Sequence, residues 1–544
     1  MTHWIMKNAG SIGLVLLSSL LLTLSFPGAD QGWLAWFALV PLILACNRCR
    51  FMASFLLGLL GGITTMFGVF YWIFQVPGIS WYHGLILALF FGTYSGLWCS
   101  GLSILRTFQL PFLFIAPAMW VSLDYLKGHA GFMALPWATL AHSQHNNLAV
   151  IQISSFTGEY GVTFLVVMAS VAVAETILHK NLRGLTIAAC IIALAHTWGF
   201  AVLSGEGKGK KLTVAVVQPS ILLSERETAS GRVVSLDRLE RLTHSAAQSH
   251  PALFVWPETA VQNLDRHAEL LMRIKNISRT VNAPIITGSS DFRKFSSKQK
   301  FTENKLILEK RIYNSAYFIT PGEILATPYR KRILLPFGEY LPFESSFKWP
   351  NWLVPKMLKV IPGDKQKQYV LLDGTNISPI ICWESLFANY VRRNVKEGAS
   401  LIALLTNDNW FGVTAAPYQH NLASVFRAVE NRVPIVIASN SGPSQIIDPF
   451  GRVLAEVPHL FSQGAATADV ELGSGNSFYT KHGDFFALIC IVGLLMCIPA
   501  MKIIRMCSTL PDTAKHNTTI FGKLFVGFIN SFSSATKRRI GHKT

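Results

Sequence analysis

Apolar residues are distributed unevenly along this 544-residue chain, and this distribution limits the folds open to it. The first 204 residues contain four acidic residues, Asp30, Asp124, Glu159 and Glu175. Residues 205–483 have the composition of an ordinary globular domain, and an apolar block returns at 485–503. With 51% hydrophobic and 14% charged residues, the chain is too apolar for a soluble protein of this size. We therefore expect a membrane-embedded part and a separate polar domain.

Eight apolar stretches are candidates for transmembrane helices, which need about 20 mainly apolar residues to cross about 30 Å of hydrocarbon. They lie at roughly 10–26, 31–46, 53–75, 80–104, 110–126, 160–178, 184–203 and 485–503. The first could instead be a signal peptide, but its n-region has one lysine and Pro27-Gly28-Ala29 is a poor cleavage site. The sequence predicts seven membrane helices within 1–204 and an eighth within 484–504.

Basic residues in the short loops predict the orientation of these helices. With eight spans, Lys127 lies on one side, and the opposite side carries Lys7, Arg48, Arg50, Arg106, Lys180 and Arg183. The basic tail 505–544 adds to the majority side. We expect both termini in the cytoplasm and 205–483 outside, which in a bacterium is the periplasmic face of the inner membrane. The net charge of +18 follows from this arrangement, so it does not favour nucleic-acid binding.

Residues 205–483 alternate short β-branched runs with amphipathic stretches, a pattern typical of a layered α/β domain. Strands are predicted at 212–218, 252–256, 284–288, 313–319, 378–382, 400–406, 434–440 and 444–449. Helices are predicted at 235–249, 264–281, 385–398 and 420–431. A hairpin around Pro449–Arg452 indicates mixed sheets. Neither GxGxxG nor GxxxxGK[ST] occurs, so no nucleotide cofactor is predicted.

Cys382 is the one cysteine within 205–483. The other seven lie in predicted spans or at their cytoplasmic ends, and the Cys46–Cys49 pair has no second pair to complete a metal site. A cysteine that ends an apolar strand is usually core packing. However, Cys382 cannot form a disulfide within its domain, and a lone thiol in an oxidising compartment is a hazard unless it is used. Glu384 also argues against a purely apolar environment, since an unpaired buried carboxylate is costly.

Three strand-end segments carry reactive side chains in a fixed order. They are WPET with Glu258, KRILLPFGEY with Lys331 and IICWES with Cys382. Each alone has an ordinary explanation as a solvated carboxylate, a basic surface or a core cysteine. Together they resemble the Glu-Lys-Cys triad of the nitrilase superfamily, with further matches at YNSA (313–316), TNDNWFG (406–412) and RAVENR with SNSG (427–442). A nitrilase-like domain placed between the seventh and eighth spans, together with the segment 135–166, resembles the apolipoprotein N-acyltransferase family.

This resemblance implies a four-layer αββα fold outside the membrane and a lipid-modification reaction. The family transfers the sn-1 acyl chain of a phospholipid to the α-amine of an S-diacylglyceryl cysteine at a lipoprotein N-terminus. The implied partners are a phospholipid donor, an apolipoprotein acceptor and the membrane, with no cofactor or metal. The triad roles that follow are nucleophile for Cys382, general base and acid for Glu258, and thiolate and oxyanion stabilisation for Lys331.

Three further residues have supporting roles in this interpretation. The backbone N–H of Trp383 is a second oxyanion donor, and Glu339 holds Lys331 in place. Glu384 either orients its loop or assists the incoming amine, and the sequence does not decide between these roles.

A long insertion at 340–363 carries apolar residues between prolines. They are Phe343, Phe347, Trp349, Trp352, Leu353, Met357 and Leu358. Such a segment forms either a small satellite core or, beside a membrane, an apolar lid that admits acyl chains and excludes water. We expect the lid, with Phe343, Trp349, Trp352 and Leu353 contacting substrate. The alternatives to the acyltransferase are a membrane-anchored nitrilase-type amidase and a transporter or sensor with an external ligand-binding domain.

Overall fold

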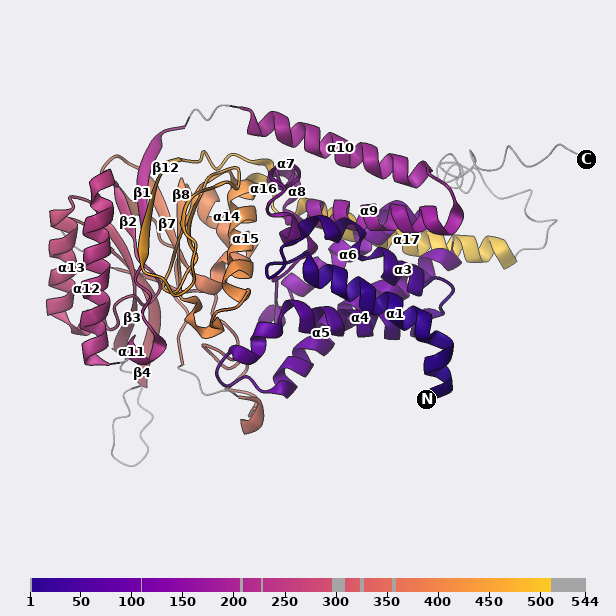
Figure 1. Ribbon diagram of the computed structural model, residues 1–544, viewed down its shortest axis with the longest axis horizontal. Coiled ribbons are helices and arrows are strands. Elements are labelled where there is room, and N and C mark those ends of the chain that lie inside the picture. Colours follow the sequence, from indigo (N-terminus) through magenta and orange to yellow (C-terminus); the bar gives the residue numbers. More distant parts are fainter. Residues whose placement is uncertain are drawn as a thin grey trace, which may run out of the picture. The chain divides into compact units, whose positions relative to one another are not determined.

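Long helices account for most of the first 203 residues in the computed structural model shown in Figure 1. The structure describes residues 2–108, 110–205, 209–226, 228–295, 309–322, 327–354 and 359–509. The long helices are α1 (Thr2–Leu24), α4 (Phe51–Val69), α5 (Trp81–Thr107), α6 (Phe112–Gly128), α9 (Glu159–His179) and α10 (Arg183–Leu203). Helix α17 (Phe485–Thr509) follows the α/β domain. Seven of the eight predicted stretches are therefore centred on a long helix.

The second predicted stretch is not one continuous helix. It is divided into η1 (Gly32–Leu34), α2 (Ala35–Ala38) and α3 (Val40–Ala45). Pro41, in the first turn of α3, has no N–H to continue the preceding helix, which accounts for the break. The third stretch also ends early, because α4 stops at Val69 and the chain continues as the 3-10 helix η2 (Tyr71–Gln75).

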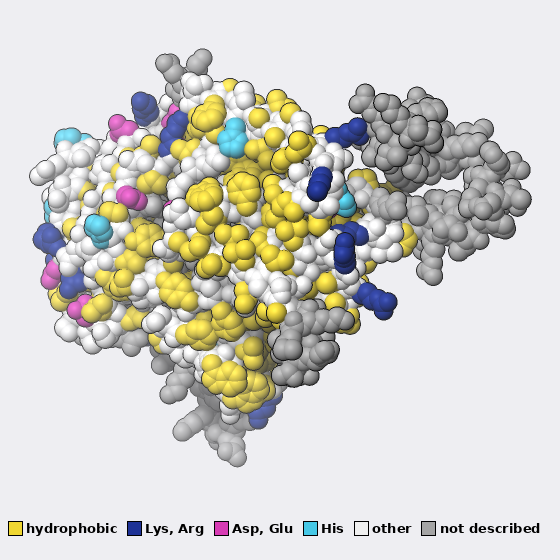
Figure 2. All heavy atoms as spheres, turned by 45° about the vertical axis from the view of Figure 1, so that its right-hand side comes forward, with side chains coloured by type: hydrophobic (Ala, Val, Ile, Leu, Met, Phe, Trp, Pro, Cys, Tyr) yellow, Lys and Arg dark blue, Asp and Glu magenta, His cyan; other side chains and the backbone are white. Residues whose placement is uncertain are grey.

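By length and hydropathy, four helices in the described part of the chain are able to cross a membrane, namely α4, α5, α9 and α10. Shorter apolar helices lie at 9–24, 32–45, 148–157 and 485–499. On the face shown in Figure 2, hydrophobic side chains cover a broad area of the helical region. Acidic side chains on that face lie toward the α/β domain. The helical region thus presents an apolar surface of the kind that lipid covers.

The α/β domain contains two six-stranded sheets. The first has the order β12-β1-β2-β3-β4-β5, with β1 (Lys211–Gln218), β2 (Leu253–Val255), β3 (Ile285–Phe295), β4 (Glu309–Ile319), β5 (Tyr329–Arg330) and β12 (Gly464–Glu471). The second has the order β11-β10-β9-β8-β7-β6, with β6 (Tyr369–Val370), β7 (Asn376–Ile381), β8 (Leu401–Thr406), β9 (Ile435–Ser439), β10 (Ser444–Ile447) and β11 (Val453–Val457). Each sheet combines parallel and antiparallel pairs, as the hairpin at β10 and β11 predicted.

Helices cover the outer face of each sheet (Figure 1). The first sheet carries α12 (Ala229–Ala246) and α13 (Ala268–Thr280), and the second carries α14 (Ala388–Lys396) and α15 (Ala416–Asn431). In β1, Val214 and Val216 pack between the sheets while Ala215 and Val217 pack against the helices. This alternation is what a strand buried on both faces requires. The predicted αββα sandwich is confirmed.

The helices that cover the second sheet pack against apolar helices of the first 203 residues. One hydrophobic core contains residues of α15, such as Phe426, together with Val162 and Leu165 of α9. A buried ionic network lies beside it, in which Arg427 Nη2 donates to Glu159 Oε2 at 2.6 Å. The Arg427 guanidinium also pairs with Glu430 at 2.7 Å. Removing Arg427 would take away the cation that pairs with both buried glutamates, a loss that is strongly destabilising in a buried ionic network.

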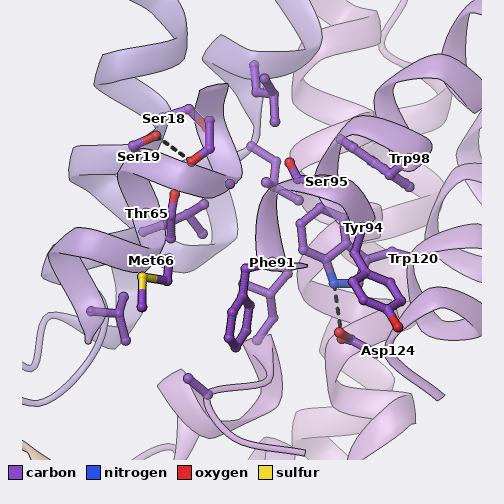
Figure 3. Close-up of a pocket in the computed structure, with 18 of the residues that line it drawn as sticks. Ser18, Ser19, Thr65, Met66, Phe91, Tyr94, Ser95, Trp98, Trp120 and Asp124 are labelled. Carbon is purple, nitrogen blue, oxygen red and sulfur yellow. Dashed lines mark hydrogen bonds between the residues drawn. The ribbon is translucent and has the colours of Figure 1, made fainter. Parts of the chain in front are cut away.

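A small cavity of about 100 Å³ lies inside the helical region. Asp124 lies on its wall, where it accepts a hydrogen bond from Trp120 Nε1 at 3.1 Å (Figure 3) and from Lys127 Nζ at 2.9 Å. Ser18, Ser19 and Ser95 add hydroxyl groups to the lining. A buried water needs about 10–15 Å³, so the cavity has room for several waters beside these polar groups, although most of its lining is apolar.

Candidate active site

The three predicted triad residues come from the ends of three strands in two sheets. Glu258 follows β2, Lys331 follows β5 directly and Cys382 follows β7 directly. Lys331 Nζ lies 3.9 Å from Glu258 Oε1. Cys382 is close enough to both for their charges to shift its pKa. The structure thus brings together residues that are separated by up to 124 positions in the sequence.

Cys382 occupies a strained turn rather than the strand in which the sequence placed it. Strand β7 ends at Ile381, and Cys382 begins the 3-10 helix η8 (Cys382–Leu386). Its φ of +50° lies in the left-handed region, which costs a non-glycine residue free energy and recurs at functional sites. The thiol is partly exposed. The N–H of Trp383 lies in the first turn of this helix, where backbone donors have no acceptor within the helix.

Desolvation and the Glu258 carboxylate raise the pKa of Cys382 well above its ordinary value, although the Lys331 ammonium opposes them. The sulfur is therefore a thiol near neutral pH. A base must take its proton before it can attack a carbonyl carbon.

Glu258 is held in a turn after Pro257 and is 8% exposed. Gly288 of β3 makes this turn possible, because a Cβ at that position would lie 2.6 Å from the Cα of Glu258. The Nδ2 of Asn314 donates to Glu258 Oε1 at 2.6 Å. The amide of Asn314 thus fixes one oxygen of the Glu258 carboxylate and thereby orients the second oxygen.

Lys331 is 2% exposed and lies between two carboxylates. Its Nζ donates to Glu339 Oε1 at 2.9 Å, and its backbone N–H donates to the carbonyl of Asn314 at 2.8 Å. Burial alone would lower the pKa of Lys331, but Glu339, Cys382 and Glu258 together raise it above its ordinary value. Lys331 therefore stays a cation throughout the neutral range, as a group that stabilises negative charge must.

Glu339 contacts Lys331, the residue that the sequence predicts it to hold. Its second oxygen, Oε2, accepts the N–H of Leu335 at 2.7 Å, which closes the turn that carries it. Asn314 Nδ2 also lies 3.4 Å from Glu339 Oε1. Asn314 thus bridges two carboxylates. Sequence reasoning found its segment, YNSA, only as a family match and gave it no role.

Glu384 is fully buried beneath this site and accepts hydrogen bonds from three backbone N–H groups. They belong to Arg332 at 2.7 Å, Ile333 at 3.2 Å and Ile381 at 2.7 Å. Burial raises the pKa of Glu384, although these donors oppose the shift. The carboxylate therefore joins the residue before Cys382 to the segment after Lys331. Its hydrogen bonds are those of a clamp between the segments that carry Cys382 and Lys331.

Two tyrosines that the sequence did not single out complete this clamp. The hydroxyl of Tyr329 donates to Glu384 at 2.6 Å and lies 2.6 Å from the hydroxyl of Tyr390. Burial raises the pKa of both tyrosines, so they remain neutral donors. Tyr329 begins the short strand β5 and Tyr390 lies in α14, so their contact arises from tertiary packing, for which the sequence held no local signal.

Loops of the helical region pack against the turn that carries Cys382. The ring of Trp383 lies 6.0 Å from that of Trp137, which in turn stacks on His420 at 5.4 Å. His420 Nδ1 lies 2.9 Å from Asp408 Oδ1, in the TNDNWFG segment. These contacts support the turn from the side of the helical region.

The insertion at 340–363 contains both a local core and exposed apolar side chains. Trp349 donates to the carbonyl of Pro342 at 2.6 Å and packs edge-on against Phe337 and Phe347. In contrast, Phe343 is 62% and Trp352 is 60% exposed, and Leu353 is half-buried. Met357 and Leu358 lie outside the described residues.

This insertion also contacts the helical region. The hydroxyl of Tyr82, at the start of α5, donates to the carbonyl of Trp352 at 2.6 Å, and their rings pack 5.4 Å apart. Phe343 meets Phe132 at 5.4 Å. Within the described part of the chain, no group of three or more His, Cys, Asp or Glu residues is placed to hold a metal ion.

Comparison with known proteins accounts for both parts of the chain. A family model described as "Apolipoprotein N-acyltransferase N-terminal domain" matches residues 18–172, and one described as "Carbon-nitrogen hydrolase" matches 213–479. An amidase of known structure from Nesterenkonia is 17% identical, covering 51% of this chain and 96% of that chain with a TM-score of 0.36.

Curated relatives match over most of their length. The apolipoprotein N-acyltransferase of Geobacter metallireducens is 32% identical over 506 residues, which cover 88% of this chain and 93% of the relative. That of Chlorobaculum tepidum is 28% identical over 537 residues, covering 90% and 96%. The chain belongs to the apolipoprotein N-acyltransferase family.

Proposed function

We propose that this chain transfers a fatty acyl group from the sn-1 position of a membrane phospholipid to an apolipoprotein. The acceptor is the α-amine of its N-terminal S-diacylglyceryl cysteine, and the product is a triacylated lipoprotein. The observation that carries this proposal is the strained, partly exposed Cys382 beside Lys331 and Glu258, in a domain that shares a core with apolar helices. Family membership supplies the substrate class.

In the first half-reaction, Glu258 takes the proton of Cys382 and the thiolate attacks the ester carbonyl carbon. The resulting oxyanion is stabilised by the Lys331 ammonium and by the backbone N–H of Trp383. Each such preorganised donor typically contributes about 3 to 4 kcal/mol to transition-state stabilisation. When the carbon–oxygen bond breaks, Glu258 returns the proton to the leaving lysophospholipid oxygen. A thioester on Cys382 remains.

In the second half-reaction, the neutral amine of the acceptor attacks the thioester carbonyl. Glu258 accepts a proton from the amine, and the thiol of Cys382 is regenerated. An amide is more stable than a thioester, so the transfer needs no nucleotide. The two substrates thus react in turn with one enzyme cysteine, which is a ping-pong mechanism.

Three other residues keep this geometry in place. Glu339 holds the ammonium of Lys331, and Asn314 holds the carboxylate of Glu258. Glu384 fixes the Cys382 turn to the segment that follows Lys331. Because its oxygens already accept these donors, we assign Glu384 to positioning and not to proton transfer with the amine.

We further propose that eight helices cross the bacterial inner membrane, seven within 1–204 and the eighth within 484–504. The catalytic domain, 205–483, then lies in the periplasm, and both termini lie in the cytoplasm. The asymmetry of the basic loop residues supports this orientation. The predicted cytoplasmic tail, 505–544, and its apolar segment 519–532 extend outside the described residues.

The exposed apolar part of the 340–363 insertion serves as a lid in this proposal. Phe343 and Trp352 enter the outer leaflet in this proposal, which their exposure supports, while Trp349 holds the segment together. Replacing both Trp352 and Leu353 with serine should slow lipid turnover without lowering the melting temperature. A variant that turns over phospholipid at the wild-type rate would remove the lid from the account.

The direct test of function is incubation of the purified chain with phospholipid and a diacylated lipopeptide. We expect the wild-type chain to form triacylated lipopeptide and Cys382→Ser to form none. Absence of product from the wild-type chain would refute the assignment. Release of free fatty acid without transfer would instead indicate a hydrolase.

A further inference from the structure

A second cavity, of about 420 Å³, lies between the helical region and the α/β domain. Its lining comes from the end of α6 and the following loop, the start of α9, the segment after Lys331, helix α14 and the residue before α17. Glu258, Lys331 and Cys382 are not among the lining residues. Its volume falls in the range of small-molecule sites, about 300–1,000 Å³. The cavity is therefore large enough for a ligand of its own.

The charged side chains of this cavity differ in whether the protein supplies them with a partner. Two acidic side chains line it, and both have partners in the protein. Glu159 pairs with Arg427, and Asp484 accepts hydrogen bonds from Tyr479 at 2.8 Å and Asn389 at 3.1 Å.

The two arginines of the lining differ from these acids. Among the residues that the structure describes, neither Arg332 nor Arg393 forms an ion pair with an acidic side chain. Arg332 is half-buried and stacks on the ring of Tyr390, with 5.8 Å between Cζ and the ring centroid. Arg393 is exposed on α14. Two guanidinium groups thus line one cavity without a carboxylate counterion from the protein.

Guanidinium groups bind phosphate oxygens in a bidentate geometry, which makes paired arginines well suited to a phosphodiester. The cavity also lies at the ends of α6 and α17 that face the α/β domain, where the proposed topology places the headgroups of the outer leaflet. We propose that this cavity binds the phosphodiester of a phospholipid headgroup through Arg332 and Arg393. The inference rests on the proposed membrane orientation, but not on the acyl-transfer chemistry.

A lipid bound in this cavity would stabilise the segment that carries Lys331 without contacting Lys331 itself. Arg332 directly follows Lys331, and its backbone N–H is one of the donors to Glu384. Ile333 and Leu386, which also line the cavity, belong to the two segments that Glu384 joins. Occupation of the site would therefore hold the clamp in its observed geometry. The bound lipid is a structural ligand that differs from the acyl donor.

The test measures lipid binding to the full chain carrying Cys382→Ser, so that no turnover occurs. Native mass spectrometry in a detergent without phosphate compares phosphatidylglycerol with diacylglycerol, which shares its acyl chains and lacks the phosphate. Hydrogen bonds to charged groups are each worth about 10- to 150-fold in an equilibrium constant. We expect Arg332→Gln with Arg393→Gln to lower retention of phosphatidylglycerol by at least about 10-fold while leaving diacylglycerol unchanged.

Two variants keep this test interpretable. Arg393→Gln alone changes an exposed side chain and should give an intermediate loss with an unchanged melting temperature. Arg241 lies on α12, in the helix layer of the first sheet, and donates to Gln463. Arg241→Gln should retain the lipid as the parent chain does. Equal retention of phosphatidylglycerol by the double variant and the parent would overturn the proposal. Displacement of the lipid by millimolar inorganic phosphate would overturn the lipid assignment in favour of a free anion.

Discussion

Replacing Glu384 with glutamine tests whether this buried carboxylate positions the catalytic segments. Its oxygens accept the N–H groups of Arg332 and Ile381, both at 2.7 Å, and of Ile333 at 3.2 Å. A glutamine has one acceptor oxygen, so its NH₂ group would face at least one of these donors. Leaving a buried N–H unpaired costs about 1–3 kcal/mol, and losing the charge on the remaining bonds adds roughly 1 kcal/mol. We expect a loss of about 2–4 kcal/mol.

If this free energy is lost from the catalytic geometry, both half-reactions should slow by about 30- to 700-fold. Intact-protein mass spectrometry would follow thioester formation, and lipopeptide acylation would follow its discharge. Tyr329→Phe is the matched control, since it removes one hydroxyl donor to Glu384, keeps every backbone donor and should cost about 1 kcal/mol. Thioester formation at the wild-type rate, with slow discharge, would show that Glu384 acts on the amine and would refute the clamp.

Three further predictions concern other contacts of the site and its support. Asn314→Leu removes the donor 2.6 Å from Glu258 and should slow thioester formation by about 10- to 150-fold in a single-turnover assay, and an unchanged rate would contradict the role of Asn314. Because desolvation and Glu258 raise the pKa of Cys382, its alkylation by iodoacetamide should still be accelerating at about pH 10, where alkylation of an ordinary cysteine has levelled off. Lys331→Met removes a cation that lowers this pKa, so the alkylation profile should move to higher pH, and a move to lower pH would contradict the assigned electrostatics. Arg427→Met removes the buried cation that pairs with Glu159 and Glu430 and should cost about 3–5 kcal/mol in denaturant unfolding, where a loss below about 1 kcal/mol would show that the network is unimportant.

The layers of the catalytic domain could be predicted because its central strands are short, continuous apolar runs. Runs such as 212–218 and 400–406 are rich in β-branched or aliphatic residues and became β1 and β8 with little change. Strand β12 was missed because Gly464–Glu471 consists largely of small and polar residues. Its place beside β1 depends on pairing across 246 to 260 positions of sequence, for which a local pattern gives no signal.

Cys382 could be proposed as the nucleophile from the sequence because it is the one cysteine within 205–483. The roles of Asn314 and Glu384, which position the site, could not be assigned from the sequence in the same way. Asn314 acts on a carboxylate 56 positions earlier, and Glu384 receives donors from residues 51 and 52 positions earlier. Such contacts arise from tertiary packing of two sheets. The cavity lined by Arg332 and Arg393 is likewise formed by segments that lie far apart in the sequence.

The central claim is that Cys382 carries the acyl group between the two substrates. Its most direct test is intact-mass analysis of the full chain after incubation with phospholipid in the absence of acceptor. We predict a single long-chain acyl adduct on Cys382 that neutral hydroxylamine removes and that a diacylated lipopeptide discharges to triacylated product. Formation of triacylated product by Cys382→Ser, or an acyl adduct that the lipopeptide cannot discharge, would contradict the account.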